Sequence, residues 1–218
     1  MAIRLVVGLG NPGARYARNR HNIGWRVLDE LARRRGLAFG AGGPAWSAAD
    51  DPAGDLVLLK PLTWMNRSGE ALVAWSRHTG MVLTGAPPVD AAGAGQAPPP
   101  AAAVRPLVVC DDLALPLGAV RLRTRGSSGG QNGLASVIGL LGGEDFPRLR
   151  LGIAPADEPV PAHLWPDYVL ADFGADEEEH VAGIVAHAAD AVECCLELGA
   201  EAAGSRFNRR GPAAPPAP

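Results

Sequence analysis

The first 36 residues place the tightest constraint on the fold. Residues 3–7 form an apolar run typical of a buried strand, and a glycine-rich turn, residues 8–13, follows it directly. The spacing of an amphipathic helix begins only at Ile23, with Asn22 as the predicted N-cap and Gly36 as the predicted stop. This stretch therefore predicts a strand, a long loop and a helix.

The long loop carries side chains suited to hydrolysis. A neutral imidazole such as that of His21 takes up a proton from water near neutral pH. The uncharged amide of Asn11 can hold a carbonyl oxygen without competing for that proton. A single histidine near a helix start is more often a capping or packing residue, so the loop alone gives only a hypothesis of hydrolysis.

A dinucleotide site is the competing interpretation of the same loop. Gly8, Gly10 and Gly13 have the G-x-G-x-x-G spacing directly after a strand. That motif needs a helix that opens within the glycines, so that its N-terminus meets the pyrophosphate, whereas Pro12 and the polar residues 15–20 intervene here. An NADP-dependent oxidoreductase is therefore the third-ranked hypothesis.

Strand and helix patterns alternate along the chain. The predicted strands are 3–7, 56–59, 107–110, 119–122 and 149–153, and the predicted helices are 22–35, 68–79, 132–141 and 176–198. This layout predicts a single α/β domain over residues 1–210, with a mixed, mostly parallel central sheet flanked by helices. The Pro/Ala/Gly-rich stretch of about 82–104 predicts a mobile insertion, and residues 211–218 a disordered tail.

Composition narrows the class of protein. A hydrophobic fraction of 47% over 218 residues suffices for one full core. The chain has neither an apolar run long enough for a membrane span nor an export signal, so we expect a cytoplasmic protein without a membrane partner. Its three cysteines and five histidines show no metal-ligand spacing, so we expect no metal and no cofactor. The apolar stripes all serve the core, which favours a monomer.

Basic residues are unevenly distributed although the net charge is only -3. Arg121, Arg123 and Arg125 alternate along a predicted strand and therefore share one face, beside the glycine-rich residues 126–133. Such a row of guanidinium groups is typical of a phosphate track.

Further polar residues follow other apolar strands. Asn66 lies beyond the strand 56–59, Asp111 ends the strand 107–110, and Asn132 lies in a glycine-rich loop. Ligands of open α/β sheets bind beyond the carboxyl ends of the strands. We therefore expect these residues to converge with Asn11 and His21 on one cleft.

The chain resembles bacterial-type peptidyl-tRNA hydrolases from residue 3 to about 209. Four motifs match in order: G-L-G-N-P-G with R-H-N, then W-M-N-x-S-G, Asp-Asp-Leu and G-G-x-N-G. The resemblance implies cleavage of the ester between a peptide and the 3′ end of tRNA. It also implies that the partner is peptidyl-tRNA, bound through its acceptor stem and 3′ end.

The resemblance assigns a role to each motif residue. It makes His21 the general base, Asp111 the carboxylate that orients the imidazole, and Asn11 and Asn66 the amides that stabilise the tetrahedral intermediate. The implied substrate contacts are Tyr16, Met65, Asn66 and Asn132, and the implied contacts to tRNA phosphates are Arg121, Arg123 and Arg150.

Three features depart from the family pattern: Ala114 where an acid is usual, Gln131 where histidine is common, and the Pro/Ala insertion. Gln131 can form hydrogen bonds but cannot titrate. RNA-binding relatives used in organelle intron splicing share this fold, so RNA binding without catalysis is the second-ranked hypothesis. The joint presence of the histidine, the aspartate and the three asparagines favours an enzyme.

Overall fold

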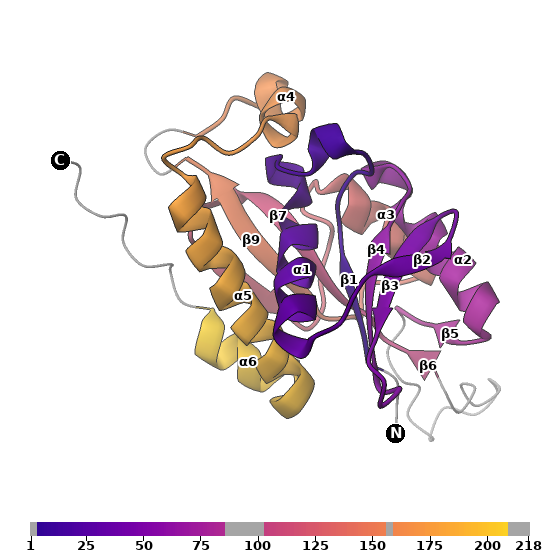
Figure 1. Cartoon of the computed structure of the whole chain (residues 1–218). Coiled ribbons are helices and arrows are strands. Elements are labelled where there is room, and N and C mark those ends of the chain that lie inside the picture. The colour runs from indigo at the N-terminus through magenta and orange to yellow at the C-terminus, as the bar shows by residue number, and fades with distance from the viewer. Residues whose placement is uncertain (1–3, 86–102, 156–158, 209–218) are drawn as a thin grey trace.

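The computed structural model describes residues 4–85, 103–155 and 159–208 (Figure 1). Within these ranges seven strands form one sheet in the order β2-β3-β4-β1-β7-β9-β8. The central strands β4, β1, β7 and β9 run parallel, whereas β2, β3 and β8 at the edges pair antiparallel. The strands of this sheet are β1 Arg4–Gly8, β2 Gly40–Gly43, β3 Trp46–Asp50, β4 Leu56–Pro61, β7 Leu107–Pro116, β8 Val120–Arg123 and β9 Arg148–Ala154. The prediction of a mixed, mostly parallel sheet is confirmed.

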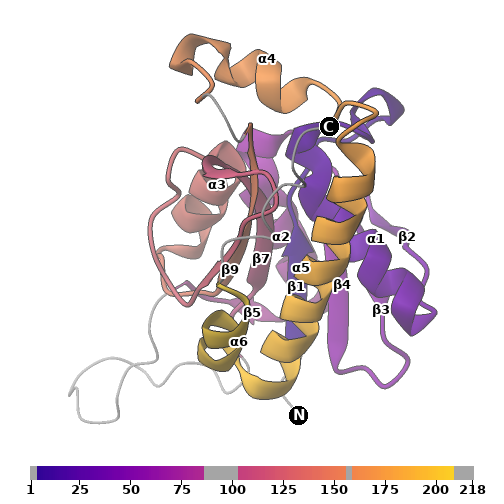
Figure 2. The same cartoon turned by 90° about the vertical axis from the view of Figure 1, so that its left-hand side faces the viewer.

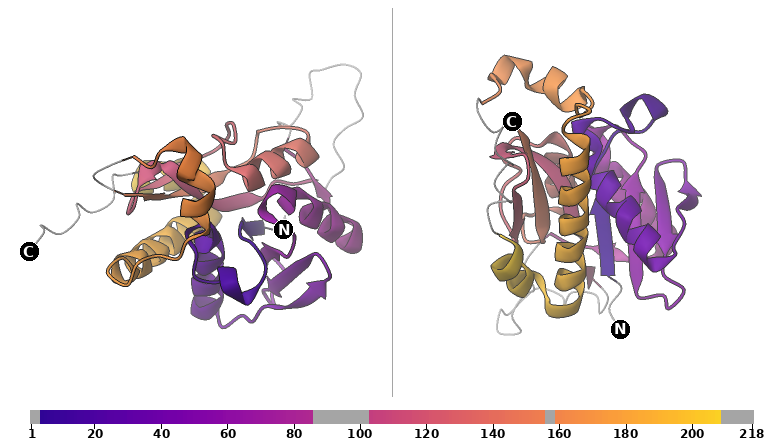
Figure 3. Two further views of the ribbon diagram at one scale, coloured as in Figure 1. Left: turned by 90° about the horizontal axis from the view of Figure 1, so that it is seen from above. Right: turned by 60° about the vertical axis from the view of Figure 1, so that its left-hand side comes forward.

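Helices cover both faces of the sheet, as the views in Figures 2 and 3 show. Apolar side chains of α1, α5 and α6 form one core cluster with the sheet, and those of α2 and α3 form a second cluster on the opposite face. A short helix, α4, stands above the carboxyl ends of the parallel strands (Figure 2). The helices are α1 Ile23–Arg35, α2 Ser68–Thr79, α3 Asn132–Leu141, α4 Trp165–Leu170, α5 Glu178–Leu198 and α6 Ala200–Phe207. The described helices include none that is long and apolar enough to cross a membrane.

Gly8, Gly10 and Gly24 allow close packing of β1, the loop after it and α1. A Cβ on Gly8 would lie 2.6 Å from the carbonyl oxygen of Gly24, and a Cβ on Gly24 would lie 2.5 Å from that of Val109. A Cβ on Gly10 would meet the indole of Trp25 at 2.8 Å. The backbone of α1 therefore packs directly against the backbone of the strands. The helix begins at Ile23, well after Gly8, Gly10 and Gly13, whereas the helix of a dinucleotide-binding fold begins within the glycine motif.

Substitution of Gly24 by alanine is expected to destabilise the protein by about 1 to 3 kcal/mol, because the new methyl group would meet rigid backbone. Gly183 in α5 is the matched control, since a Cβ there meets nothing within 4 Å. Gly183→Ala should stabilise the protein by about 0.5 to 1 kcal/mol through helix propensity. Urea unfolding of both variants measures the difference, and equal stability of the two would contradict the close crossing.

Every strand and helix predicted from the sequence corresponds to an element of the structure, but several elements were not predicted. Strands β2 and β3 are rich in glycine and alanine, which carry little strand signal. Two short parallel strands, β5 Val82–Leu83 and β6 Ala103–Val104, pair at the two ends of the predicted insertion. They are too short for a periodic pattern. The middle of that insertion and the tail 211–218 lie outside the described residues.

Candidate functional site

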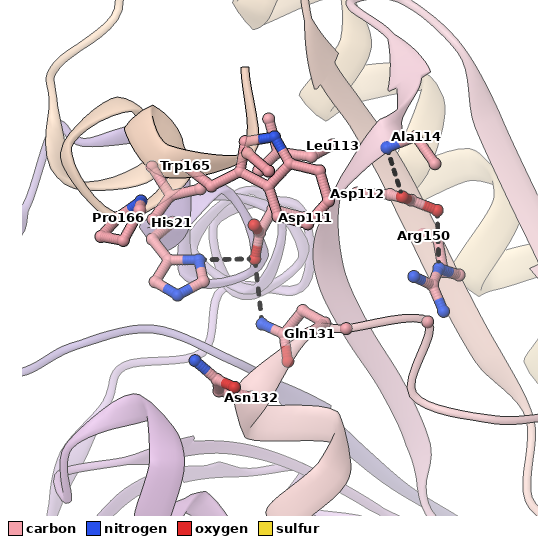
Figure 4. Close-up of a pocket in the computed structure, with 14 residues that line it drawn as sticks. His21, Asp111, Asp112, Leu113, Ala114, Gln131, Asn132, Arg150, Trp165 and Pro166 are labelled. Atoms are coloured by element: carbon pink, nitrogen blue, oxygen red, sulfur yellow. Dashed lines mark hydrogen bonds and ion pairs between the residues drawn. The ribbon is translucent and has the colours of Figure 1, made fainter. Parts of the chain in front are cut away.

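A cleft of about 390 Å³ opens between the carboxyl-terminal half of β7, the start of α3 and the helix α4 (Figure 4). Strand β7 bulges between Asp112 and Pro116 relative to β9, and the side chain of Asp112 accepts a hydrogen bond from the N–H of Ala114 at 2.8 Å within this bulge. The cleft is lined by His21, Asp111, Asp112, Leu113, Ala114, Gly129, Gly130, Gln131, Asn132, Arg150, Ala162, Trp165, Pro166 and Val169.

The centre of the cleft is a pair formed by His21 and Asp111. His21 lies in a short helical turn, η2 Arg20–Asn22, which Asn19 caps by accepting a hydrogen bond from the N–H of Asn22. Its Nδ1 lies 2.9 Å from Oδ1 of Asp111, and the two side chains are only 11% and 3% exposed. Burial alone would lower the pKa of His21, but the negative charge of Asp111 and its contact with the ring outweigh burial and raise it. The imidazole is therefore a stronger base than a free histidine.

Gln131 supports this pair from the other side. Its Nε2 donates to Oδ1 of Asp111 at 3.0 Å, as Figure 4 shows, and its Oε1 accepts from the N–H of Leu134 at 2.6 Å. The same side chain thus orients the carboxylate and caps α3. An amide can fill both roles without titrating.

Two arginines of β9 fix the glycine-rich loop that leads to Gln131. Nε of Arg150 pairs with Oδ2 of Asp112 at 2.7 Å, and its Nη1 donates to the carbonyl of Ser128 at 3.1 Å. Arg148 is 1% exposed and donates to the carbonyl of Gly126. Arg150, predicted as a phosphate contact, is therefore largely occupied within the protein.

Asn11 is buried beside the cleft and does not line it. Its Oδ1 accepts from the N–H of Met65 at 2.8 Å, which orients the amide so that its NH₂ group points away from Met65. Both polar atoms of the Asn22 side chain bind the backbone of Asn11, at 2.8 and 2.9 Å. Asn22 is the N-cap residue of α1, as predicted, but its side chain forms no capping hydrogen bond, because its contacts with the Asn11 backbone occupy it.

The remaining predicted substrate contacts lie outside the lining of the cleft. Asn66 is exposed in the turn η3 Met65–Arg67, while Met65 is buried with its sulfur 3.2 Å from Nε2 of Gln131. Tyr16 packs edge-on against Trp64, with ring centroids 5.8 Å apart. Of the four predicted motif segments, three line the cleft, and the fourth contacts the lining residue Gln131 through Met65.

The arginines of β8 lie on the surface next to the site. Arg121 and Arg123 are exposed, whereas Val120 and Leu122 between them are buried, so the predicted alternation is confirmed for these positions. In the sheet Arg121 pairs with Arg150 of β9. Residues directly opposite each other on paired strands share a face of the sheet. Arg121 and Arg123 on the edge strand β8 therefore lie beside the buried Arg150 and Arg148 of β9.

Histidine, cysteine and acidic side chains are the candidate metal ligands and nucleophiles of the chain. The residues that the structure describes contain no group of three or more histidine, cysteine or acidic side chains able to hold a metal ion. Cys110 is fully buried, and burial raises the pKa of its thiol far above the usual range.

Comparison with known proteins identifies the family. The sequence model of the peptidyl-tRNA hydrolase family matches residues 5–85 and 96–214. A peptidyl-tRNA hydrolase of Symbiobacterium thermophilum is 42% identical over 94% of this chain and 98% of its own length, and one of Roseiflexus castenholzii is 43% identical over 98% and 89%. The crystal structure of the enzyme from Acinetobacter baumannii superposes with a TM-score of 0.76 at 30% identity, covering 97% of both chains. Because the match extends over nearly the whole sequence and the whole fold, the chain belongs to the peptidyl-tRNA hydrolase family.

Proposed function

We propose that the protein hydrolyses the ester bond between peptide and tRNA, with His21 as the general base. The observation that carries the proposal is the contact of His21 with Asp111 inside an open cleft of a family member. Figure 4 shows the second ring nitrogen of His21 directed away from Asp111, toward the side of the cleft that carries Asn132. A water molecule bound there would be within reach of the base.

The chemistry follows from the contacts of the two side chains. His21 takes a proton from water as the water oxygen attacks the acyl carbon, and Asp111 stabilises the imidazolium that forms. The tetrahedral intermediate then collapses, the ester C–O bond breaks, and the ribose oxygen leaves with the proton from His21. The products are a peptide with a free carboxylate and a tRNA with a free 3′ end. Gln131 keeps Asp111 oriented throughout.

Amide groups stabilise the developing charge in this proposal. The N–H of Met65 holds the oxygen of the Asn11 amide, so its NH₂ group is the part available to an oxyanion. Asn132 lines the cleft and can hydrogen-bond the water or the peptide. Asn66 is exposed beside Met65 and would act on a substrate that extends past the cleft.

The tRNA would lie across the exposed arginines of β8. Phosphate contacts position the nucleic acid without reading its sequence, which suits an enzyme that accepts any tRNA. Arg121 and Arg123 are exposed, and Nη1 of Arg123 donates to the carbonyl of Leu122 at 3.2 Å, whereas Arg150 offers only its Nη2 beyond the contacts with Asp112 and Ser128.

The double substitution Arg121→Gln and Arg123→Gln is expected to weaken tRNA binding severalfold and to reduce the slope of log K against log salt by about 0.7 to 0.9 per lost phosphate contact. Hydrolysis of a small ester analogue should not change. Arg77→Gln, at an exposed position of α2, removes the same kind of charge from another element and serves as the control. An equal loss on tRNA and small substrates would contradict the phosphate assignment.

The direct test of the function measures peptide release from an N-acetylated aminoacyl-tRNA, with free aminoacyl-tRNA as the control substrate. We expect rapid release from the blocked substrate only. Binding of tRNA without any release would favour the RNA-binding hypothesis and contradict the enzyme.

A further inference from the structure

We propose that Trp165 is a specificity-determining residue that contacts the side chain of the last amino acid of the peptide. This inference rests on the proposed function and adds a preference for apolar acyl groups. Its basis is a division of the cleft into two walls of different chemistry.

Apolar side chains form one wall of the cleft. Figure 4 shows Leu113, Trp165 and Pro166 on one side of the pair formed by His21 and Asp111, with Gln131 and Asn132 on the other. Trp165 lines the cleft and is 45% exposed. An exposed aromatic ring beside a reactive centre gains most when an apolar group covers it.

The apolar wall is held rigidly. Nε1 of Trp165 donates to the carbonyl of Val160 at 2.8 Å, and the hydroxyl of Tyr168 donates to the carbonyl of Ile153 in β9 at 2.7 Å. The first hydrogen bond orients the indole against the preceding loop, and the second anchors α4 to the sheet. The ring therefore offers a preformed surface, which lowers the entropy lost on binding.

Arg20 connects α4 to η2, the turn that carries His21. Its guanidinium lies over the ring of Tyr168, 4.4 Å from the centroid, while Nη1 donates to the carbonyl of Asp172 at 2.6 Å and Nη2 pairs with Glu177 at 2.7 Å. Arg20 directly precedes His21 in η2. The position of the apolar wall is thereby tied to the position of the base.

Charge complementarity selects the occupant of this wall. When the ester carbon lies at His21, the ribose and phosphates extend toward the side of the cleft that carries Arg150. The exposed arginines of β8 lie next to Arg150 on the same side. The acyl side chain is then the part of the substrate left for Leu113 and Trp165. The wall is open to solvent, so it produces a preference and does not exclude polar residues.

The test compares one tRNA body charged with N-acetylphenylalanine or N-acetylglycine. For the wild type we expect kcat/KM to favour phenylalanine by about five- to tenfold, because an open wall covers only part of the side chain. Trp165→Ala should reduce this ratio to about one, and Trp165→Phe should retain most of it, since burial of an aromatic ring drives the preference. Leu170→Ala is the matched control, because Leu170 is 43% exposed on the same helix but does not line the cleft.

Each outcome separates the two proposals. A ratio that Trp165→Ala leaves unchanged, or a wild type without preference, overturns the role of Trp165 while the hydrolase stands. An equal loss on both substrates in Trp165→Ala places the indole against the nucleotide and also overturns it. Absence of release from either substrate by the wild type contradicts the proposed function itself.

Discussion

Replacing His21 by alanine should lower kcat for release of N-acetylated amino acids from tRNA by about 10²- to 10⁴-fold, the usual contribution of a general base. The Kd for tRNA should change little, because the exposed arginines proposed to contact phosphate, Arg121 and Arg123, lie on β8. Removal of a side chain that is only 11% exposed also leaves a small cavity next to Asp111. Single-turnover hydrolysis and tRNA binding measured on the same preparation separate the chemical loss from the binding loss.

The control for this variant is His187→Ala. His187 is exposed on α5 and lies outside the lining of the cleft, so its removal should leave the rate at the wild-type level. Retention of more than about a tenth of the rate by His21→Ala would be inconsistent with general-base catalysis by this residue.

Asp111→Asn is expected to reduce kcat/KM by about 10²- to 10⁴-fold and to move the acidic limb of the pH profile to lower pH. Burial lowers the pKa of His21, and the charge of Asp111 together with its contact with the ring outweighs burial and raises it. Once the charge is removed, burial acts alone, so the pKa of the imidazole falls. The base is then unprotonated at lower pH, but it is weaker and its protonated form has no counter-ion. Profiles of kcat/KM between about pH 5 and 9 measure both effects.

The pH dependence of the free energy of unfolding is an independent test of the pair formed by His21 and Asp111. The folded-state pKa of His21 lies above the ordinary value, so the stabilisation from this pair is fully present below that ordinary value and is lost as the pH rises through the folded pKa. Urea unfolding should show this pH dependence in the wild type and in the control Asp50→Asn, whose side chain is exposed at the end of β3. A raised pKa of His21 in Asp111→Asn would refute the assignment.

The fold and the centre of the site could be predicted because both depend on local pattern. Alternating strand and helix signals imply an α/β sheet, and the carboxyl ends of its strands meet at one edge. His21 lies in the loop after β1 and Asp111 lies in β7, and these strands are parallel neighbours, so the convergence of the two side chains follows from topology. Asn132 follows the antiparallel strand β8, and the glycine-rich loop brings it to the same cleft.

The partners of individual side chains could not be predicted. Arg150 has the same sequence context as an exposed strand arginine, yet Asp112, 38 positions away, pairs with it in the interior. In the sequence Arg20 is one of several arginines in a polar loop. Its partners in the structure lie more than 150 positions further along the chain. Such choices depend on contacts between distant segments, which leave no periodic signal.

The backbone contact between α1 and the sheet also fixes the distance between His21 and Asp111. Gly24 lies three residues after His21, and Val109, whose carbonyl oxygen faces it, lies two residues before Asp111. The spacing of imidazole and carboxylate is therefore set by two main chains in contact, with no core side chain between them. Substitutions of apolar residues elsewhere in the core should therefore change the stability of the protein more than the geometry of the pair.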